Sequence, residues 1–216
     1  MRVVIAGGHG KIALILEGLL SARGDEAVGL IRNPAQSADL EAAGATPVVL
    51  DLESASVAEV ADAVRGADAV VFAAGAGPGS GAARKQTVDR DAAILLADAA
   101  EAAGVGRYVM VSALSADDRS LDDGYDEVFR AYMRAKSEAD TDVRARAGLR
   151  TTIVRPGGLT DDAGTGNVTV AESTGRGSIP REDVARVLLA VLHEPETVGR
   201  TFEVISGDTP IDTALH

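Results

Sequence analysis

The amino-acid sequence predicts an α/β fold in which a doubly wound parallel sheet of about seven strands has helices on both faces. Three observations lead to this prediction. Short apolar runs alternate with longer segments of helical periodicity along the chain. Most of the short runs are continuous in Val, Ile and Ala, as in parallel strands that are covered on both faces. The 216 residues are enough for one large domain with a substantial core.

Seven short apolar segments are expected to form the strands. Turn residues or helical segments separate each of them from the next. A further short run, Asn167–Val170, is expected to form a strand inside the Gly-rich loop 157–177. The seven segments are Arg2–Ala6, Ala27–Ile31, Pro47–Leu50, Ala69–Ala73, Tyr108–Ser112, Thr151–Arg155 and Phe202–Ile205.

Between these segments, apolar residues recur at intervals of three and four, as on one face of a helix. Gly24 and Gly104 follow two of the helical segments, where a left-handed residue commonly ends a helix. The main helices are expected at Ile12–Leu20, Thr87–Ala103, Asp126–Ala147 and Val184–Leu192.

Composition disfavours several classes of function. The net charge of -12 disfavours binding to nucleic acid or to an anionic membrane surface. There is no cysteine, and the three histidines lack zinc-ligand spacing, so no metal site is expected. No apolar run is long enough to span a bilayer. Because the first predicted strand begins at Arg2, we expect no signal peptide and a cytoplasmic location.

A glycine-rich turn, Ala6-Gly7-Gly8-His9-Gly10-Lys11-Ile12-Ala13, follows the first predicted strand. Gly7 permits a tight turn, Gly10 lets the backbone approach a pyrophosphate, and the small Ala13 allows close packing of the following helix. A plain strand-to-helix turn is the alternative, but the position between the first strand and a helix favours dinucleotide binding. The side chain of His9 is expected to be exposed. The loop residues expected to contact the cofactor are Gly7, Gly8, His9, Gly10, Lys11 and Ile12.

Arg32 stands where an NAD-binding chain has an acid. That acid binds the ribose 2′-hydroxyl from the end of the second strand, ~20 residues beyond the glycines. Here the segment reads Gly29-Leu30-Ile31-Arg32-Asn33, and the guanidinium suits a 2′-phosphate. A solvated loop arginine is the alternative. We therefore expect NADP (NADPH) as the cofactor, with NAD as the weaker alternative.

Tyr132 and Lys136 are four residues apart on a predicted helix and therefore share one face. A neighbouring lysine favours the phenolate, so we expect a lowered pKa and a tyrosine that exchanges protons near neutral pH. An exposed helical pair without chemistry is the alternative. The position after the fifth strand, beside the ligand crevice of a doubly wound sheet, favours the chemical interpretation.

Together these features resemble the short-chain dehydrogenase/reductase superfamily. Within this superfamily the chain most resembles the small atypical NAD(P)H-binding members, which are related to flavin and biliverdin reductases and to NmrA-like proteins. It covers nearly the whole chain, which we expect to be a single NAD(P)-binding Rossmann domain, 1–216, with small substrate-side insertions at about 157–180. Besides the glycine turn, it rests on Val70–Gly75, Arg107–Ser112, Tyr132–Lys136, Thr152–Thr160 and Arg181–Ala185.

The resemblance implies a role for each segment. Asp51 and Leu52 would contact the adenine, and the segment Ala73-Ala74-Gly75 would pass behind the adenine ribose. Ser112 would lie near the nicotinamide and the substrate, and Tyr132 and Lys136 would form the catalytic pair. The remaining cofactor contacts would come from Val111, Lys136, Pro156, Gly157, Gly158 and Leu159.

Two positions depart from the superfamily pattern. The usual catalytic serine is the second of a Ser-Ser pair, and here the pair reads Ser112-Ala113, so that Ser112 or Ser115 would have to replace it. The asparagine that usually supports the lysine is Asp89. These departures affect the expected alcohol–ketone chemistry and leave cofactor binding unaffected.

Three functions compete. The first is an NADPH-dependent oxidoreductase that transfers hydride to a small quinone, flavin or carbonyl acceptor, with Tyr132 as the proton donor. The second is a non-catalytic NADPH-binding redox sensor, which Ala113 favours. The third is a nucleotide-sugar epimerase or dehydratase, which ranks last because only about sixty residues follow the sixth strand.

Several surface features remain open. Tyr125 and Phe129 either wall the substrate pocket or pack in the core. Arg84 and Lys85 either meet an anionic substrate or, as we favour, lie on the surface. The exposed faces of the long helices are the candidates for a homodimer interface. The expected ligand besides the cofactor is a small molecule.

Overall fold

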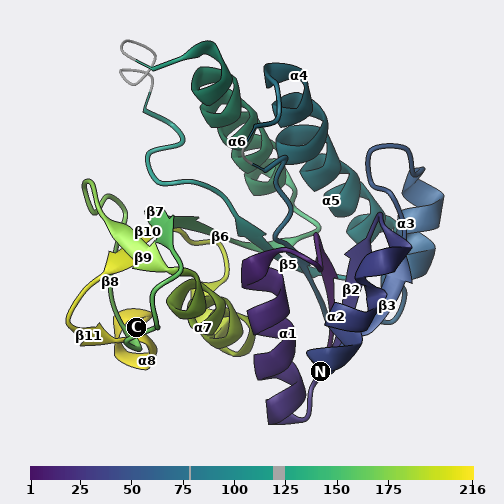
Figure 1. Cartoon of the computed structure of the whole chain (residues 1–216), viewed down its shortest axis with the longest axis horizontal. Helices are drawn as coiled ribbons and strands as arrows, with labels where there is room; N and C mark the ends of the chain where they lie inside the picture. The colour runs from purple at the N-terminus through teal and green to yellow at the C-terminus, as the bar shows by residue number, and fades with distance from the viewer. Residues whose placement is uncertain (78, 119–124) are drawn as a thin grey trace.

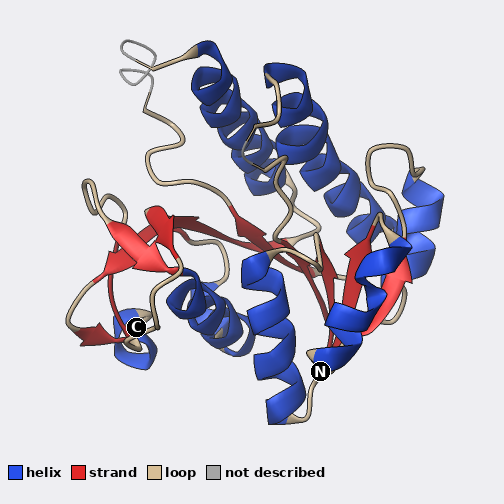
Figure 2. Cartoon of the chain, viewed as in Figure 1, coloured by secondary structure: helices blue, strands red, loops and turns tan. Residues whose placement is uncertain are grey.

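A computed structural model describes residues 1–77, 79–118 and 125–216. Nine strands form one sheet in the order β11-β8-β10-β6-β5-β4-β1-β2-β3 (Figures 1 and 2). The seven strands from β10 to β3 run parallel to their neighbours, which confirms the predicted fold class. In sheet order these are β10 (Thr201–Ser206), β6 (Arg150–Pro156), β5 (Arg107–Val111), β4 (Ala69–Phe72), β1 (Arg2–Ala6), β2 (Glu26–Ile31) and β3 (Thr46–Val49).

Two antiparallel strands extend the sheet beyond the predicted seven. β8 (Asn167–Ala171) pairs with β10, and β11 (Thr209–Pro210) pairs with β8. The expected strand at Asn167–Val170 is therefore present. β7 (Gly158–Thr160) and β9 (Ser178–Pro180) form a separate two-stranded parallel sheet. The segment expected to carry the substrate side thus contains three short strands.

Successive residues of the central strands belong to two different apolar clusters. On β1, Val3 and Ile5 pack in the cluster beneath α1 and α7, whereas Val4 and Ala6 pack in the cluster beneath α3 and α5. Because both faces of the sheet are covered, the strands read as continuous apolar runs. The covering helices are α1 (Lys11–Arg23) and α7 (Arg181–His193) on one face, and α3 (Val57–Val64), α5 (Ala92–Ala103) and α6 (Glu127–Ala145) on the other.

The ends of the helices follow the chemistry of their capping residues. Gly24 ends α1 and Gly104 ends α5, both in the left-handed region with φ of 87° and 73°. Asp126 precedes α6, and its carboxylate accepts a hydrogen bond of 2.8 Å from the Phe129 amide. The helix expected at Thr87–Ala103 instead begins with a wide π-helical segment, η2 (Lys85–Asp91), before α5.

The helical run expected to end before Gly44 is α2 (Ser37–Ala42), and Gly44 has a φ of 81°. The short helix α3 was not anticipated from periodicity. The sequence does contain a signal for α3, because Ser56 and Glu59 form a capping box with reciprocal side-chain and backbone hydrogen bonds. A window of eight residues is too short for periodicity alone to find this helix.

The sheet reverses its winding direction between β1 and β4. From β1 the chain continues to β2 and β3 on one side, and then crosses to β4, β5 and β6 on the other. Open α/β sheets form a ligand crevice at the carboxyl ends of the strands beside such a reversal. None of the described helices is both long enough and apolar enough to cross a membrane.

Candidate functional site

A cleft with two adjoining cavities lies at the carboxyl ends of the parallel strands. The first cavity has a volume of about 250 Å³ and the second about 530 Å³. The segment Ala73–Ala76 lines both, so the two cavities form one continuous cleft. The first residue after each of six strands lines this cleft: Gly7, Arg32, Leu50, Ala73, Ser112 and Gly157.

The glycine turn brings the end of β1 against the segment after β4. Gly7 has a φ of +81°, and a Cβ atom there would lie 2.6 Å from the Cα of Ala74. The Gly10 amide closes the turn by donating to the Gly7 carbonyl at 2.8 Å. Only glycine fits at position 7, because both the backbone conformation and the space exclude a side chain.

The N-terminus of α1 faces the cleft without an anionic group of its own. Gly10 precedes the helix in an extended conformation and supplies no side-chain cap. The first turn contains no acidic residue, and Ala13 is fully buried against the sheet. Unpaired first-turn amides and the positive end of the helix dipole suit a phosphate. These features fit the pyrophosphate of a dinucleotide.

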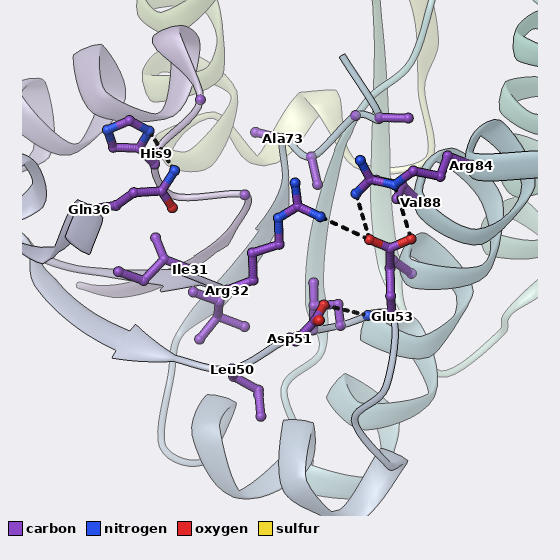
Figure 3. Close-up of a pocket in the computed structure, with 18 residues that line it drawn as sticks. His9, Ile31, Arg32, Gln36, Leu50, Asp51, Glu53, Ala73, Arg84 and Val88 are labelled. Carbon is purple, nitrogen blue, oxygen red and sulfur yellow. Dashed lines mark hydrogen bonds and ion pairs between the residues drawn. The ribbon is translucent and has the colours of Figure 1, made fainter. Parts of the chain in front are cut away.

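Two arginines and one glutamate meet in the first cavity (Figure 3). Glu53 accepts from Arg84 through both carboxylate oxygens, with Nη2 at 2.6 Å and Nε at 3.3 Å. Arg32 Nη1 donates to the same carboxylate at 3.2 Å, and Thr87 Oγ1 does so at 2.9 Å. The Arg84 hydrogen bond is the main reason why the pKa of Glu53 is lowered. This cluster was not anticipated, since only Arg32 had been assigned to the cofactor.

The structure separates the expected cofactor residues into two groups. Most of them line the cleft, including Ile12, Asp51, Leu52, Val111 and Leu159. Gly8, Lys11 and Gly158 line neither of its cavities. Gly8 is buried and donates to the Leu30 carbonyl at 3.0 Å, and Gly158 donates to the Gly177 carbonyl at 2.9 Å.

Two side chains of the glycine turn are held by neighbouring acids. The exposed side chain of Lys11 pairs with Asp161 at 2.6 Å. His9 is half-buried rather than exposed, because its ring contacts Gln36 at 3.0 Å and Asp39 at 2.7 Å. His9 lines the first cavity nonetheless, beside the glycine turn (Figure 3).

Tyr132 and Lys136 lie together in the second cavity, as expected for residues four apart on α6. Lys136 is 3% exposed, its Nζ atom lies 5.9 Å from the centre of the Tyr132 ring, and it donates to the Val111 carbonyl at 3.2 Å. Asp89, from η2, pairs with this ammonium group at 3.4 Å and accepts from the Ala76 amide at 3.3 Å. The acid at the expected asparagine position therefore contacts the lysine directly.

The expectation of a lowered pKa for Tyr132 was wrong. Burial raises the pKa of Tyr132, and the negative charges of Asp89 and Asp140 raise it further. Asp89 offsets the charge of Lys136, so the ammonium group does not outweigh the cost of burying a phenolate. A tyrosine in this environment retains its proton at neutral pH.

The two candidate serines have different surroundings. Ser112 lines the second cavity, where its buried hydroxyl group interacts with the buried carboxyl group of Asp140. Ser115 instead directs its amide and hydroxyl to Glu203 Oε1, at 2.8 and 3.4 Å. Ala113, in the usual serine position, is buried against Met133 and its neighbours. Of the two serines, Ser112 is the one positioned to meet a ligand.

Lys85 lies in the second cavity and is only 9% exposed, so the favoured surface location was wrong for this residue. Its Nζ atom donates to the Gly77 carbonyl at 3.0 Å and lies 5.2 Å from the centre of the Tyr132 ring. Phe129 also lines this cavity, and Tyr125 stacks on Phe129 with ring centres 4.3 Å apart. The aromatic residues therefore form one wall, with Tyr125 behind it.

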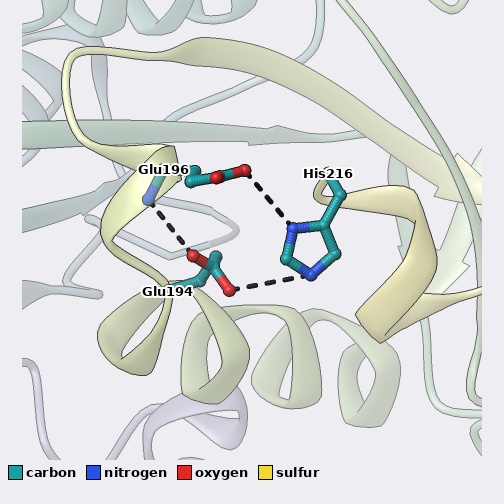
Figure 4. A group of neighbouring side chains, drawn as sticks. All are labelled: Glu194, Glu196 and His216. Carbon is teal, nitrogen blue, oxygen red and sulfur yellow. Dashed lines mark hydrogen bonds and ion pairs between the residues drawn. The ribbon is translucent and has the colours of Figure 1, made fainter.

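Glu194, Glu196 and His216 come together outside these two cavities (Figure 4). His216 lies 3.7 Å from Glu194 and 3.5 Å from Glu196. Glu194 also accepts a hydrogen bond of 3.2 Å from the Glu196 amide. Spacing along the sequence gives no sign of this grouping, since the C-terminal residue folds back onto the end of α7. These contacts join the C-terminal residue to the segment that follows α7.

Comparison with known proteins places this cleft in a family. Residues 7–195 match the family model described as NAD(P)H-binding. The chain is 41% identical over 216 residues to the Bacillus subtilis protein named "Uncharacterized sugar epimerase YhfK", covering 100% of this chain and 99% of that protein.

Solved structures agree on the fold. A Bacillus halodurans structure titled "Putative NAD-dependent epimerase/dehydratase" has a TM-score of 0.91 and 38% identity, covering 100% of this chain and 98% of the other. The oxidoreductase ylbE from Lactococcus lactis has a TM-score of 0.87 and 24% identity, covering 100% and 95%.

Proposed function

The chain belongs to the NAD(P)H-binding family and has the fold of the atypical short-chain dehydrogenases/reductases, and we propose that it is an NADPH-dependent oxidoreductase that reduces a small quinone, flavin or carbonyl acceptor. The position of Tyr132 carries this proposal. Its side chain lines the cavity that continues directly from the dinucleotide cleft. Beside a hydride donor, a phenol can supply the proton that the reduced acceptor needs.

The preference for NADPH is supported by the charges in the first cavity. The residue that follows β2 is Arg32 rather than an acid, and Arg32 and Arg84 converge on the carboxylate of Glu53. A 2′-phosphate would compete with Glu53 for these two guanidinium groups, and Asp51 lines the same cavity. In the proposed complex the first-turn amides of α1 bind the pyrophosphate, and Asp51 and Leu52 flank the adenine.

In the second cavity Tyr132, Lys136 and Ser112 each have a proposed role. A reduced nicotinamide bound there would supply a hydride to the acceptor. Tyr132 donates its phenolic proton to the acceptor oxygen, and solvent later reprotonates the phenolate. Lys136 holds the carbonyl group at the end of β5 at this end of the cleft, and the Ser112 hydroxyl, which also interacts with Asp140, would hydrogen-bond the acceptor. Because burial raises the pKa of Tyr132, the phenol keeps its proton at neutral pH and has one to give in the reductive direction.

Two other functions make different predictions. A redox sensor would bind NADPH without turnover, which Ala113 in the serine position favours. The names of two relatives suggest an epimerase, which would interconvert nucleotide sugars with no net consumption of NADPH. The retained Tyr132 and Lys136 pair supports an enzyme over a sensor.

A single assay separates the three functions. The purified protein is titrated with NADPH, and absorbance at the nicotinamide band is then followed with quinones, flavins, aldehydes and UDP-hexoses. The proposal predicts binding followed by stoichiometric NADPH oxidation with one of the first three classes. Tight binding without consumption on any acceptor would favour the sensor. Interconversion of UDP-hexoses in a parallel incubation with the oxidised cofactor, without net reduction of that cofactor, would favour the epimerase.

A further inference from the structure

Lys85 is a buried cation that faces the proposed substrate cavity, and none of the carboxylates in the described residues pairs with it. It is 9% exposed, and its only hydrogen bond within the described part of the chain is to the Gly77 carbonyl. An ammonium group has three N–H donors, so most of this capacity is unused. Buried charges are normally paired, because removal from water is costly.

The neighbouring charges explain why no internal partner is available. Asp89, one helical turn away on η2, is committed to Lys136 at 3.4 Å and to the Ala76 amide. Asp126 also lines the cavity, but its carboxylate caps α6 through the Phe129 amide. Among the described residues that line the cavity, Lys85 is thus the cation whose charge the protein itself does not balance.

The location of Lys85 ties it to the reaction centre. Its Nζ atom lies 5.2 Å from the centre of the Tyr132 ring, and the Lys136 ammonium lies 5.9 Å from the same centre. A ligand group that contacts Lys85 would therefore lie beside the proposed proton donor. The rest of the lining is largely apolar near Phe129, Val128 and Leu159, which suits a planar hydrocarbon body.

We infer that Lys85 binds an anionic group of the acceptor, and that the substrate is a planar carbonyl or quinone compound bearing a carboxylate or similar anion. This inference rests on the proposed function, because it places the acceptor in the second cavity. The anion supplies the counter-charge that Lys85 lacks, and the ring packs against Phe129. The π-helical segment η2 places both Lys85 and Asp89 in the second cavity.

The test compares anions with neutral amides of the same shape. Wild-type protein saturated with NADP⁺ is titrated by calorimetry with benzoate, 2-naphthoate and 1,4-naphthoquinone-2-sulfonate, and with benzamide and 2-naphthamide as neutral counterparts. We expect each carboxylate to bind about tenfold or more tightly than its amide, since a charge-assisted hydrogen bond distinguishes them. Lys85→Met should abolish this difference, and Lys85→Arg should retain it.

Controls separate this site from general effects. Arg65→Met removes an exposed cation with the same change in net charge and should keep the difference in affinity. NADP⁺ affinity and circular dichroism of each variant establish that the fold and the cofactor cleft are intact. The inference is overturned if wild type binds none of the three anions, if it binds amides as well as carboxylates, or if Lys85→Met keeps the preference. Because the assay needs no turnover, anion binding without NADPH oxidation would uphold the site while rejecting the oxidoreductase.

Discussion

The Nζ atom of Lys136 lies 3.4 Å from Oδ1 of Asp89, and both side chains are almost completely buried. The pair joins α6 to η2 at the back of the second cavity. Because the carboxylate offsets the ammonium charge, the lysine does not hold Tyr132 in its phenolate form. In the proposed reaction the phenol therefore acts as the proton donor.

Replacement of Asp89 tests this electrostatic relationship. Asp89→Asn removes a negative charge that raises the pKa of Tyr132, so that pKa should fall. Because activity requires the protonated phenol, the loss of kcat on raising the pH should begin at a lower pH in this variant than in wild type. The alkaline limb of the kcat profile should therefore move toward neutrality. Asp91→Asn, which removes an exposed carboxylate from the same segment, should leave the profile unchanged. An unshifted limb in Asp89→Asn would reject the role assigned to the pair.

The arginine cluster should determine cofactor preference. We expect NADPH to bind at least several-fold more tightly than NADH, and Arg32→Ala and Arg84→Ala each to reduce that difference, because both guanidiniums lie at the proposed 2′-phosphate position. Glu53→Gln should strengthen NADPH binding, since the carboxylate no longer competes for the two arginines. Calorimetry with both cofactors measures the effect. Equal dissociation constants in wild type would contradict the assignment.

Gly7 should be required for both stability and cofactor binding. Gly7→Ala introduces strain at a φ of +81° and places a Cβ atom 2.6 Å from the Ala74 backbone. Gly66 has a similar φ of +74° with no atom within 4 Å, so Gly66→Ala introduces the strain alone. Thermal melts should show about 1 kcal/mol lost for Gly66→Ala and a larger loss for Gly7→Ala. Only Gly7→Ala should weaken NADPH binding, and equal effects would refute the close approach.

Glu17 should make the stability of the protein depend on pH. Its carboxyl group is buried beneath the glycine turn, where a Cβ atom at Gly29 would lie 2.6 Å from Oε1, and neither oxygen has a hydrogen-bond partner among the described residues. Burial raises the pKa of Glu17 from 4.5 to about 8. The unfolded chain therefore releases this proton at a lower pH than the folded protein does.

The consequence is a loss of stability as pH rises. The contribution of Glu17 to the free energy of unfolding is fully present below about pH 4.5, where the group is protonated in both states. It decreases as the pH rises to about 8 and does not change further above that pH. Its size is of order a few kcal/mol, since one pKa unit corresponds to about 1.4 kcal/mol. In denaturant titrations at several pH values, Glu17→Gln should remove this component and the exposed Glu41→Gln should retain it. A wild-type slope that survives in Glu17→Gln would assign the effect to another group.

The sequence predicted the structure best at positions where a single conformational or packing requirement explains the residue type. Continuous apolar strands predicted a sheet covered on both faces, and Gly7 predicted a tight turn that the structure realises against Ala74. The short edge strand β11 has no such pattern, because two residues cannot display a period. The central strands and the glycine turn were therefore predictable from the sequence, whereas the edge strand β11 was not.

The site was predictable residue by residue only in part. Residues that follow strand ends, such as Arg32 and Ser112, were found because strand ends converge in this fold. The partners that change their chemistry come from segments distant in sequence, and spacing does not show them. Glu53 joins Arg84 across 31 positions. Asp89 was assigned beside Lys136 only through the family resemblance, and the burial that raises the pKa of Tyr132 has no signal in the spacing.

The central claim is that Tyr132 protonates an acceptor reduced by NADPH, and a pair of matched variants tests it most directly. Tyr132→Phe removes the hydroxyl group from the second cavity, whereas Tyr125→Phe removes one from the ring stacked behind Phe129. With the acceptor that wild type reduces fastest, the account predicts that kcat falls about 100-fold or more in Tyr132→Phe. The NADPH dissociation constant should stay the same, and Tyr125→Phe should behave like wild type. An unchanged kcat in Tyr132→Phe would contradict the account.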